Sequence, residues 1–336
     1  MNSIPQWARA FARLPGICAL ATAVTCAALP LAAGAADPAF PTKPVRMVIP
    51  FAPGGLTDLV ARVIQPKLSE RLGQTVLIDN RPGAGGVIAT NHVAKSAPDG
   101  HTLFLSWDTH TINPIAMKQL PYDTFKDLAP VTLMIRLPLV MGAWSQLPAN
   151  SLGEFVKLAK SQPGKLNFAS IGSGSSNRLY SELLNSLAGI DVVHVPYSGG
   201  GAAILAMMSG EAAYGFFSYG SMQAHLKSGK LKALAVTGTR RLAELPDTPT
   251  MVEAGFPGYE AYSWVGIYAA AGTPDAIITR LNREFVAVLN DPEINKRLTG
   301  MGVEVVASTP QALAKFQQDD HQKWVDFVRK AKLQFD

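Results

Sequence analysis

Short apolar runs alternate with amphipathic stretches along most of the chain. The runs are rich in Val, Ile, Leu and Phe, which is typical of buried strands. The predicted strands cover 45–51, 75–78, 102–105, 166–170, 192–195, 213–217, 231–236 and 264–270. The predicted helices cover 57–72, 87–94, 152–160, 177–188, 202–208, 274–289 and a terminal stretch from 310. This alternation predicts an α/β fold of parallel sheets with helices on both faces.

The alternation restarts after Leu137, which divides the predicted elements into two sets. We expect two lobes of ordinary domain size, with 37–137 and 263–336 in the first lobe and 138–262 in the second. The chain then crosses between the lobes near Leu137 and Tyr262, and these crossings are the predicted hinges.

The first 36 residues have the layout of a signal peptide. Arg9 and Arg13 supply a positive start, an apolar stretch follows, and the small residues of 31–36 offer a cleavage site after Ala35 or Ala36. The apolar stretch is too short to span a bilayer, so we favour secretion to the periplasm over a membrane anchor.

Removal of this segment also removes every cysteine. Cys18 and Cys26 both lie inside it, so the mature chain is expected to lack disulfides, thiol chemistry and cysteine–metal sites. A lipoprotein modified at Cys26 is an alternative that the residues before it disfavour. The 30 basic residues less Arg9 and Arg13 leave 28 against 25 acidic ones, a net charge of about +3. No basic tract indicates a nucleic-acid partner.

Four glycine-rich junctions lead from a predicted strand into a predicted helix. Such junctions can aim free backbone N–H groups at one point, where the helix dipole favours an anion. Each junction alone is better explained by the tight turn that glycine permits, but four together favour a binding site beyond the carboxyl ends of the strands. The junctions are Pro53-Gly54-Gly55, Gly83–Gly86, Gly172–Ser176 and Ser198–Gly201.

Arg178 lies in the first turn of its predicted helix, where a cation opposes the helix dipole. A bound carboxylate would reverse that penalty and could take a bidentate pair with the guanidinium. The alternative is a solvated arginine that pairs with Glu182 four residues on. On the first interpretation, Arg178→Ala weakens binding more than Asp58→Asn does.

No motif indicates catalysis. The Gly172–Asn177 segment lacks the third glycine of a dinucleotide-binding loop, no P-loop is present, and Phe216 replaces the first glycine of a nucleophile elbow at Ser218. The six histidines have no metal-ligand spacing, so we expect neither a metal nor a cofactor. The rival hypothesis is a secreted α/β enzyme that acts on a small organic acid with Asp58 or His110 as base.

From Pro41 onward, the chain resembles the Bug family of periplasmic solute receptors, which serve tripartite tricarboxylate transporters. The resemblance rests on ordered motifs across almost the whole mature chain. They lie at Phe40–Pro44, Val48–Gly55 with Asp58, Asn80–Gly86, Ala97–Leu103, Ile112–Pro114, Gly172–Ser175, His194–Tyr197, Ser228–Thr237, Pro249–Gly255 and Gly272–Pro274.

The resemblance implies a periplasmic binding protein with two Rossmann-like lobes that close on a ligand in the cleft between them. It also implies a receptor, not an enzyme, that binds a small carboxylate and works with the membrane components of such a transporter or with a sensor kinase. The family clamps the carboxylate with two loops, here Phe51–Asp58 and Gly172–Arg178. The residues expected to bind the ligand are Phe51, Pro53, Gly54, Gly55, Asp58, Ser106, Trp107, Gly172, Ser173, Gly174, Ser175, Arg178, Tyr197, Ser198, Gly199 and Ser218.

Three side chains depart from the family pattern. Arg178 stands where members usually have histidine, Ser218 where many have aspartate, and Trp107 is unusual in its loop. The loss of an acid argues against a ligand with an ammonium group. The departures favour an anion with an apolar or aromatic body, either a monocarboxylate or a dicarboxylate whose second charge meets Arg178.

Overall fold

The fold is that of a computed structural model, which describes residues 40–172, 174–259 and 261–335. The predicted signal peptide, its two cysteines and Ser173 lie outside the described residues. None of the helices within these ranges is both long and apolar enough to cross a bilayer.

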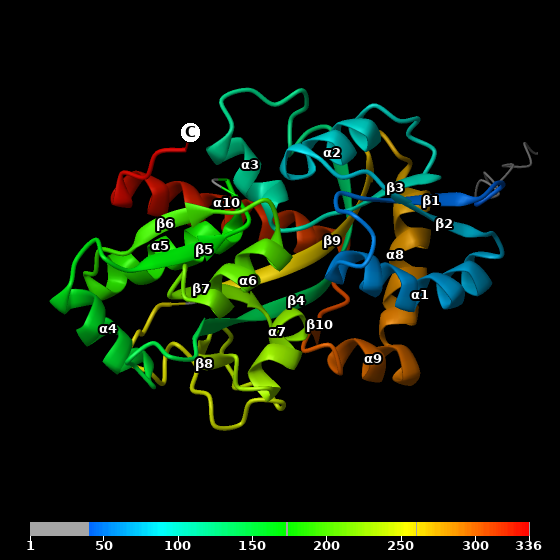
Figure 1. The fold of residues 1–336 in the computed structure, drawn as a ribbon. Coiled ribbons are helices and arrows are strands. Elements are labelled where there is room, and N and C mark those ends of the chain that lie inside the picture. Colours follow the sequence, from blue (N-terminus) through cyan, green and yellow to red (C-terminus); the bar gives the residue numbers. More distant parts are fainter. Residues whose placement is uncertain (1–39, 173, 260, 336) are drawn as a thin grey trace, which may run out of the picture. The chain divides into compact units, whose positions relative to one another are not determined.

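The elements follow the predicted alternation of strands and helices (Figure 1). In chain order they are β1 (Val45–Ile49), α1 (Leu56–Leu72), β2 (Val76–Asn80), the 3-10 helix η1 (Ala84–Gly86), α2 (Val87–Ala94), β3 (Thr102–Leu105), α3 (Thr109–Ala116), β4 (Leu128–Trp144), α4 (Leu152–Ser161), β5 (Asn167–Ser170), α5 (Ser176–Ala188), β6 (Val193–Pro196), α6 (Gly200–Ser209), β7 (Tyr214–Ser218), α7 (Tyr219–Lys227), β8 (Leu231–Val236), β9 (Tyr262–Ala270), α8 (Asp275–Leu289), α9 (Pro292–Thr299), β10 (Glu304–Val305) and α10 (Pro310–Ala331).

The strands form a mixed arrangement in the order β2-β1-β3-β9-β4-β7-β5-β6, with β8 and β10 also paired to β4. The prediction of parallel sheets is confirmed for β2-β1-β3 and for β7-β5-β6. It is wrong for β4 and β9, which pair antiparallel with each other and with their other neighbours. Strand direction leaves no trace in an apolar run, because a strand buried on both faces looks the same either way.

The long strand β4 joins the two groups of strands, as Figure 1 shows. Its residues up to Pro138 pair with β9, and its residues from Leu139 onward pair with β7 and β8. The sequence suggested a break at this point, whereas the structure has one continuous strand that changes partners. Pro138 lies opposite Tyr262, the first residue of β9. Both predicted crossings therefore lie side by side.

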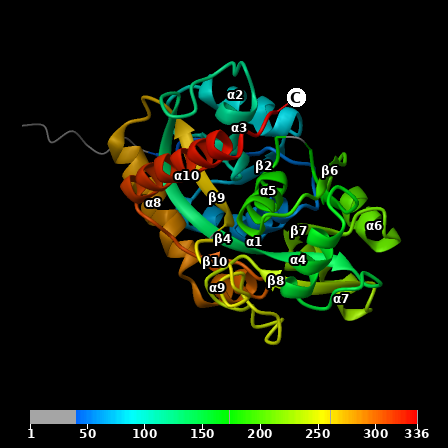
Figure 2. The same ribbon diagram turned by 90° about the vertical axis from the view of Figure 1, so that its left-hand side faces the viewer.

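The core lies between the strands and the helices that cover them. Helices α8 and α10 both pack against β4, and Figure 2 shows α10 lying across β4 and β9. Helix α10 has one apolar face: Leu313 and Trp324 are buried, and Phe316, Phe327 and Val328 pack against the core.

Candidate ligand-binding site

A cavity of about 750 Å³ lies where the loops after β1 and β3 face the loops that lead into α5, α6 and α7. None of the described residues that line it is Lys, Arg, Asp, Glu or His. Its polar groups are hydroxyls, side-chain amides and backbone. Ten of the residues expected from the sequence line it: Phe51, Pro53, Gly55, Trp107, Gly172, Gly174, Ser175, Ser198, Gly199 and Ser218.

Five helices begin at this cavity. The N-cap residues of α1, α2, α5, α6 and α7 all line it, and they are Gly55, Gly86, Ser175, Gly199 and Ser218. Ser175 and Ser218 cap their helices through the side chain, but the three glycines cannot. Among the described residues, the N-caps of α1, α2 and α6 thus offer no side-chain acceptor to the first N–H groups of their helices. Five positive helix ends around an uncharged lining suit an anion.

The loop before α1 is held by Asp58, which is 2% exposed and does not line the cavity. One carboxylate oxygen accepts the N–H of Gly54 at 3.0 Å, and both oxygens accept Arg62 at 2.8 and 3.1 Å. Asn80 donates to Asp58 and to the carbonyl of Phe51. The Arg62 hydrogen bond is the main cause that lowers the pKa of Asp58. Asp58 thus fixes the loop before α1, and Phe51 and Gly55 of this loop line the cavity.

Phe51 and Trp107 give the cavity an aromatic side. Their rings meet edge to face, with centroids 6.2 Å apart. Leu139 of β4, Ile171 and Phe217 add further apolar lining. This surface suits a ligand with an apolar body next to its charged group.

Three other predicted residues lie outside the lining. Ser106 is fully buried and exchanges hydrogen bonds with the backbone of Gly266, so it secures the pairing of β3 with β9. Tyr197 donates its hydroxyl to Glu211 at 2.9 Å. Gly54 has a φ of 88°, a conformation that glycine adopts without strain, and it shapes the turn before α1.

Arg178 also does not line the cavity. Its Nε lies 3.7 Å from Glu182 Oε1, its Nη2 donates to the carbonyl of Gln334 at 3.0 Å, and its guanidinium lies 5.2 Å from the ring centre of Phe335. The pair with Glu182 is present, as the alternative interpretation held, but the side chain is 12% exposed and not solvated. The guanidinium of Arg178 is thus in contact with the C-terminal segment, 156 residues away in sequence. Its contact with a ligand stays a prediction that the geometry does not favour.

Several lining residues were absent from the predicted set. Asn177 lies within the second predicted clamp loop and donates to the carbonyl of Phe216. Asn113 donates to the carbonyl of Gly85 at 3.1 Å. It belongs to the motif Ile112–Pro114, to which the sequence assigned no ligand contact. Ser263 is the second residue of β9, directly after the predicted hinge at Tyr262. Their signal was the position of each in or beside a predicted loop or hinge.

The geometry does not supply the base that the enzyme hypothesis needs. Asp58 is held by Arg62, as above. His110 is 2% exposed between the rings of Phe104 and Tyr268, and burial lowers its pKa to about 3, so it is neutral. Neither residue lines the cavity. Within the described ranges, no three His, Cys, Asp or Glu side chains group to hold a metal ion.

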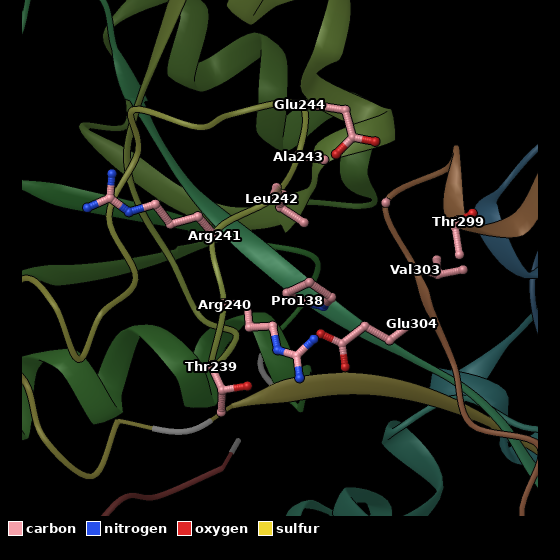
Figure 3. Close-up of a pocket in the computed structure, with 11 residues that line it drawn as sticks. Pro138, Thr239, Arg240, Arg241, Leu242, Ala243, Glu244, Thr299, Val303 and Glu304 are labelled. Atoms are coloured by element: carbon pink, nitrogen blue, oxygen red, sulfur yellow. The ribbon is translucent and has the colours of Figure 1, made fainter. Parts of the chain in front are cut away.

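A second cavity of about 420 Å³ lies on the opposite face of β4 (Figure 3). Pro138 lines it, whereas Leu137 and Leu139 line the first cavity, because successive side chains of a strand point to opposite faces. Figure 3 shows Arg240, from the loop after β8, extending toward Glu304 of β10.

Comparisons with known proteins agree with this geometry. The family model of the tripartite tricarboxylate transporter family receptor matches residues 60–333. BugT of Bordetella pertussis (strain Tohama I) is 35% identical over 301 residues, which cover 89% of this chain and 92% of BugT.

Two solved structures of Rhodopseudomonas palustris proteins are similar throughout. MatC, solved with bound malate, is 36% identical with a TM-score of 0.77, over 86% of this chain and 100% of MatC. A second protein, solved with adipate, is 32% identical with a TM-score of 0.81, over 87% of this chain and 98% of its own. The matched family is one of receptors, so the enzyme hypothesis is wrong. The structure titled periplasmic binding protein BugD is also similar, with 31% identity and a TM-score of 0.79 over 88% of this chain and 100% of BugD, and the chain has this two-lobed fold. The chain belongs to the receptor family of tripartite tricarboxylate transporters.

Proposed function

We propose that this receptor captures a small carboxylate with an apolar body in the 750 Å³ cavity, acts in the periplasm, and delivers the ligand to the membrane components of a tripartite tricarboxylate transporter. The observation that carries the proposal is the set of five helix N-caps around a lining without charged side chains.

An anion in such a cavity is recognised by backbone N–H groups and hydroxyls. The dipoles of α1, α2 and α6 are not offset by a side-chain cap at Gly55, Gly86 or Gly199, so a carboxylate there meets positive helix ends. A buried cationic ligand would face the same positive helix ends with no acid to neutralise it. The cavity therefore selects against an ammonium group.

The neighbours bound to malate and adipate support a dicarboxylate, and the apolar side supports a body longer or more apolar than that of malate. In this receptor a second carboxylate would meet another helix N-cap, such as that of α6 or α7, with no need for Arg178. A monocarboxylate would leave that end to the hydroxyls of Ser218 and Ser221.

Calorimetric titration with adipate and with its uncharged diamide tests the recognition of charge. Adipate is expected to bind and the diamide to bind at least about a hundredfold more weakly, because it offers no anion to the helix ends. Adipate recovered after incubation should be chemically unchanged. Equal affinity for acid and diamide would contradict the proposal.

If adipate fails, mass spectrometry of small molecules retained by natively purified receptor identifies the physiological ligand, and that ligand replaces it in the titration. A retained amine or sugar without a carboxylate would overturn the assignment.

Delivery is tested by uptake of radiolabelled ligand into cells that carry the transporter membrane components. Uptake should require the receptor and should fail with a receptor that cannot bind. Fractionation of the same cells checks that the receptor is in the periplasm. Delivery of the ligand to a sensor kinase remains a prediction.

A further inference from the structure

Asp108 is a buried acid whose side chain does not cap its own helix. It stands at the N-cap position of α3, yet its side chain makes no capping hydrogen bond. Its Oδ2 lies instead 2.9 Å from the hydroxyl of Tyr180 on α5, and the residue is 1% exposed. Its neighbours Trp107 and Thr109 both line the ligand cavity. The Asp108–Tyr180 contact therefore ties the wall after β3 to the helix that begins at the opposite wall.

The contacts of Tyr180 need one more proton than an ionised Asp108 allows. The Tyr180 hydroxyl lies 2.9 Å from Asp108 Oδ2 and 3.0 Å from the carbonyl oxygen of Tyr262, and it has only one proton to donate. Pro138, which lies opposite Tyr262 in the ladder, has no N–H to offer that carbonyl. A protonated Asp108 completes the chain: Asp108 donates to Tyr180, and Tyr180 donates to Tyr262.

The surroundings of Asp108 agree with this count. Within the described ranges, its second oxygen has no hydrogen bond of normal geometry, which is costly for a buried carboxylate and less so for a carboxylic acid. Burial raises the pKa of Asp108 to about 7, although hydrogen bonds from Ser263, Ser176 and Tyr180 oppose the shift.

One further titratable group faces Asp108, from α10. The carboxyl of Asp320 raises the pKa of Asp108 further. Asp320 is itself buried and accepts hydrogen bonds from Thr111 at 2.7 Å and Trp264 at 3.2 Å, and burial raises its pKa too. No cation is among the groups that act on Asp108.

We propose that Asp108, in its neutral form, is a positioning residue that sets the separation of the two cavity walls, so that ligand affinity falls when this acid ionises. The proposal rests on the proposed function, because it concerns the same cavity. Loss of the shared proton leaves either the Tyr262 carbonyl or Asp108 Oδ2 without a hydrogen bond from Tyr180 and loosens α5 from the Trp107 segment. Asp108 touches no ligand in this scheme, and it acts through Tyr180 and through its neighbours.

The test compares Asp108→Asn with Asp108→Ala in titrations with adipate at about pH 6 and about pH 8. Wild type should bind about tenfold more weakly at the higher pH, since ionisation of one group carries at most tenfold per pH unit. Asp108→Asn keeps a donor toward Tyr180, so it should match wild type at the lower pH and show no loss at the higher one. Asp108→Ala should bind weakly at both. Asp319→Asn is the control, because Asp319 is an exposed acid on the same helix α10, and it should keep the wild-type pH dependence.

Weak binding by Asp108→Asn at the lower pH, or an unchanged pH dependence in it, overturns the proposal. An infrared spectrum of the ligand-free receptor gives a readout that does not depend on adipate. Wild type should show a protonated-carboxyl band at about pH 6 that disappears in Asp108→Asn. If adipate binds to no variant while the band behaves as expected, the proposed ligand class is wrong but the protonation of Asp108 is supported. If the band is the same in both proteins, the neutral acid has failed.

Discussion

At the scale of single residues, the sequence suggested that Arg178 matters more than Asp58 for ligand binding, whereas the structure favours the opposite order. The guanidinium of Arg178 is engaged by Glu182, Gln334 and Phe335, away from the cavity lining. Asp58 fixes the loop that carries Phe51 and Gly55 into that lining. The expected order of effects on binding is therefore reversed.

Arg178→Ala should change ligand affinity less than about threefold but lower the free energy of unfolding by about 1–3 kcal/mol, because it leaves the half-buried Glu182 without its partner. Urea unfolding and calorimetry on the same protein measure the two quantities. A large loss of affinity with unchanged stability would restore the direct contact with the ligand.

Asp58→Asn should weaken binding about five- to tenfold, since the loop before α1 loses its charge-assisted hydrogen bonds. The lowered pKa of Asp58 means that its contribution to stability is present above its ordinary value of 3.8 and disappears as pH falls through the lower folded value. The stability difference between wild type and variant should therefore shrink on acidification below about pH 4. A constant difference across that range would show that the charge is not what holds the loop.

Trp107→Ala tests the aromatic side of the cavity. It removes an indole that packs edge to face on Phe51, and it should weaken an apolar-bodied ligand by about 1.5–3 kcal/mol. The matched control is Leu205→Ala, an apolar truncation on α6 at a side chain that is 62% exposed and outside the lining. Equal effects of the two variants would mean that Trp107 does not meet the ligand.

At the scale of elements, the glycine at the start of α2 is expected to be irreplaceable. Gly86 has a φ of 95°, and an added Cβ would lie 3.1 Å from the side chain of Pro50, which also lines the cavity. Gly86→Ala should cost about 1–3 kcal/mol of stability and weaken binding, because the helix end must shift. Gly73→Ala is the control, since this glycine ends α1 at a φ of 69° with nothing near its missing Cβ. It should cost about 1 kcal/mol and leave affinity unchanged.

The elements that the sequence revealed and those that it hid differ in physical terms. Short strands between glycine turns were found because burial makes them apolar throughout. Strand β4 was not, because the alternation was taken to restart after Leu137, where Pro138 follows, although a strand tolerates proline where its N–H need not pair. Helix α9 was also missed, despite Asp291 as N-cap and Pro292 in its first turn, because it has few apolar residues.

The same contrast holds for the candidate site. A turn at the start of a helix is encoded by adjacent residues, so the glycine and serine junctions at 53–55, 172–175 and 198–199 could be recognised from the sequence. Partners that arrive from far along the chain leave no local mark. The contact of Arg178 with the C-terminal segment and that of Asp108 with Tyr180 needed the folded structure.

At the scale of the whole molecule, the paired crossing strands predict closure on ligand. The two groups of strands are joined through β4 and β9 near Pro138 and Tyr262, and the cavity is lined by loops from both groups. Small-angle scattering should give a smaller radius of gyration with saturating ligand than without it. An unchanged radius, with binding confirmed by calorimetry, would contradict closure.

The alternation of Leu137, Pro138 and Leu139 gives this closure a second consequence. Two cavities share one strand as their common wall, one on each face. If the lobes rotate about that strand so that the ligand cavity narrows, we expect the cavity beside Pro138 to widen. Any compound that fits the second cavity better in its widened form then holds the receptor shut, and reciprocity requires the ligand to raise the affinity of that compound by the same factor. Ligand binding by this receptor is then expected to respond to molecules that share no chemistry with a carboxylate.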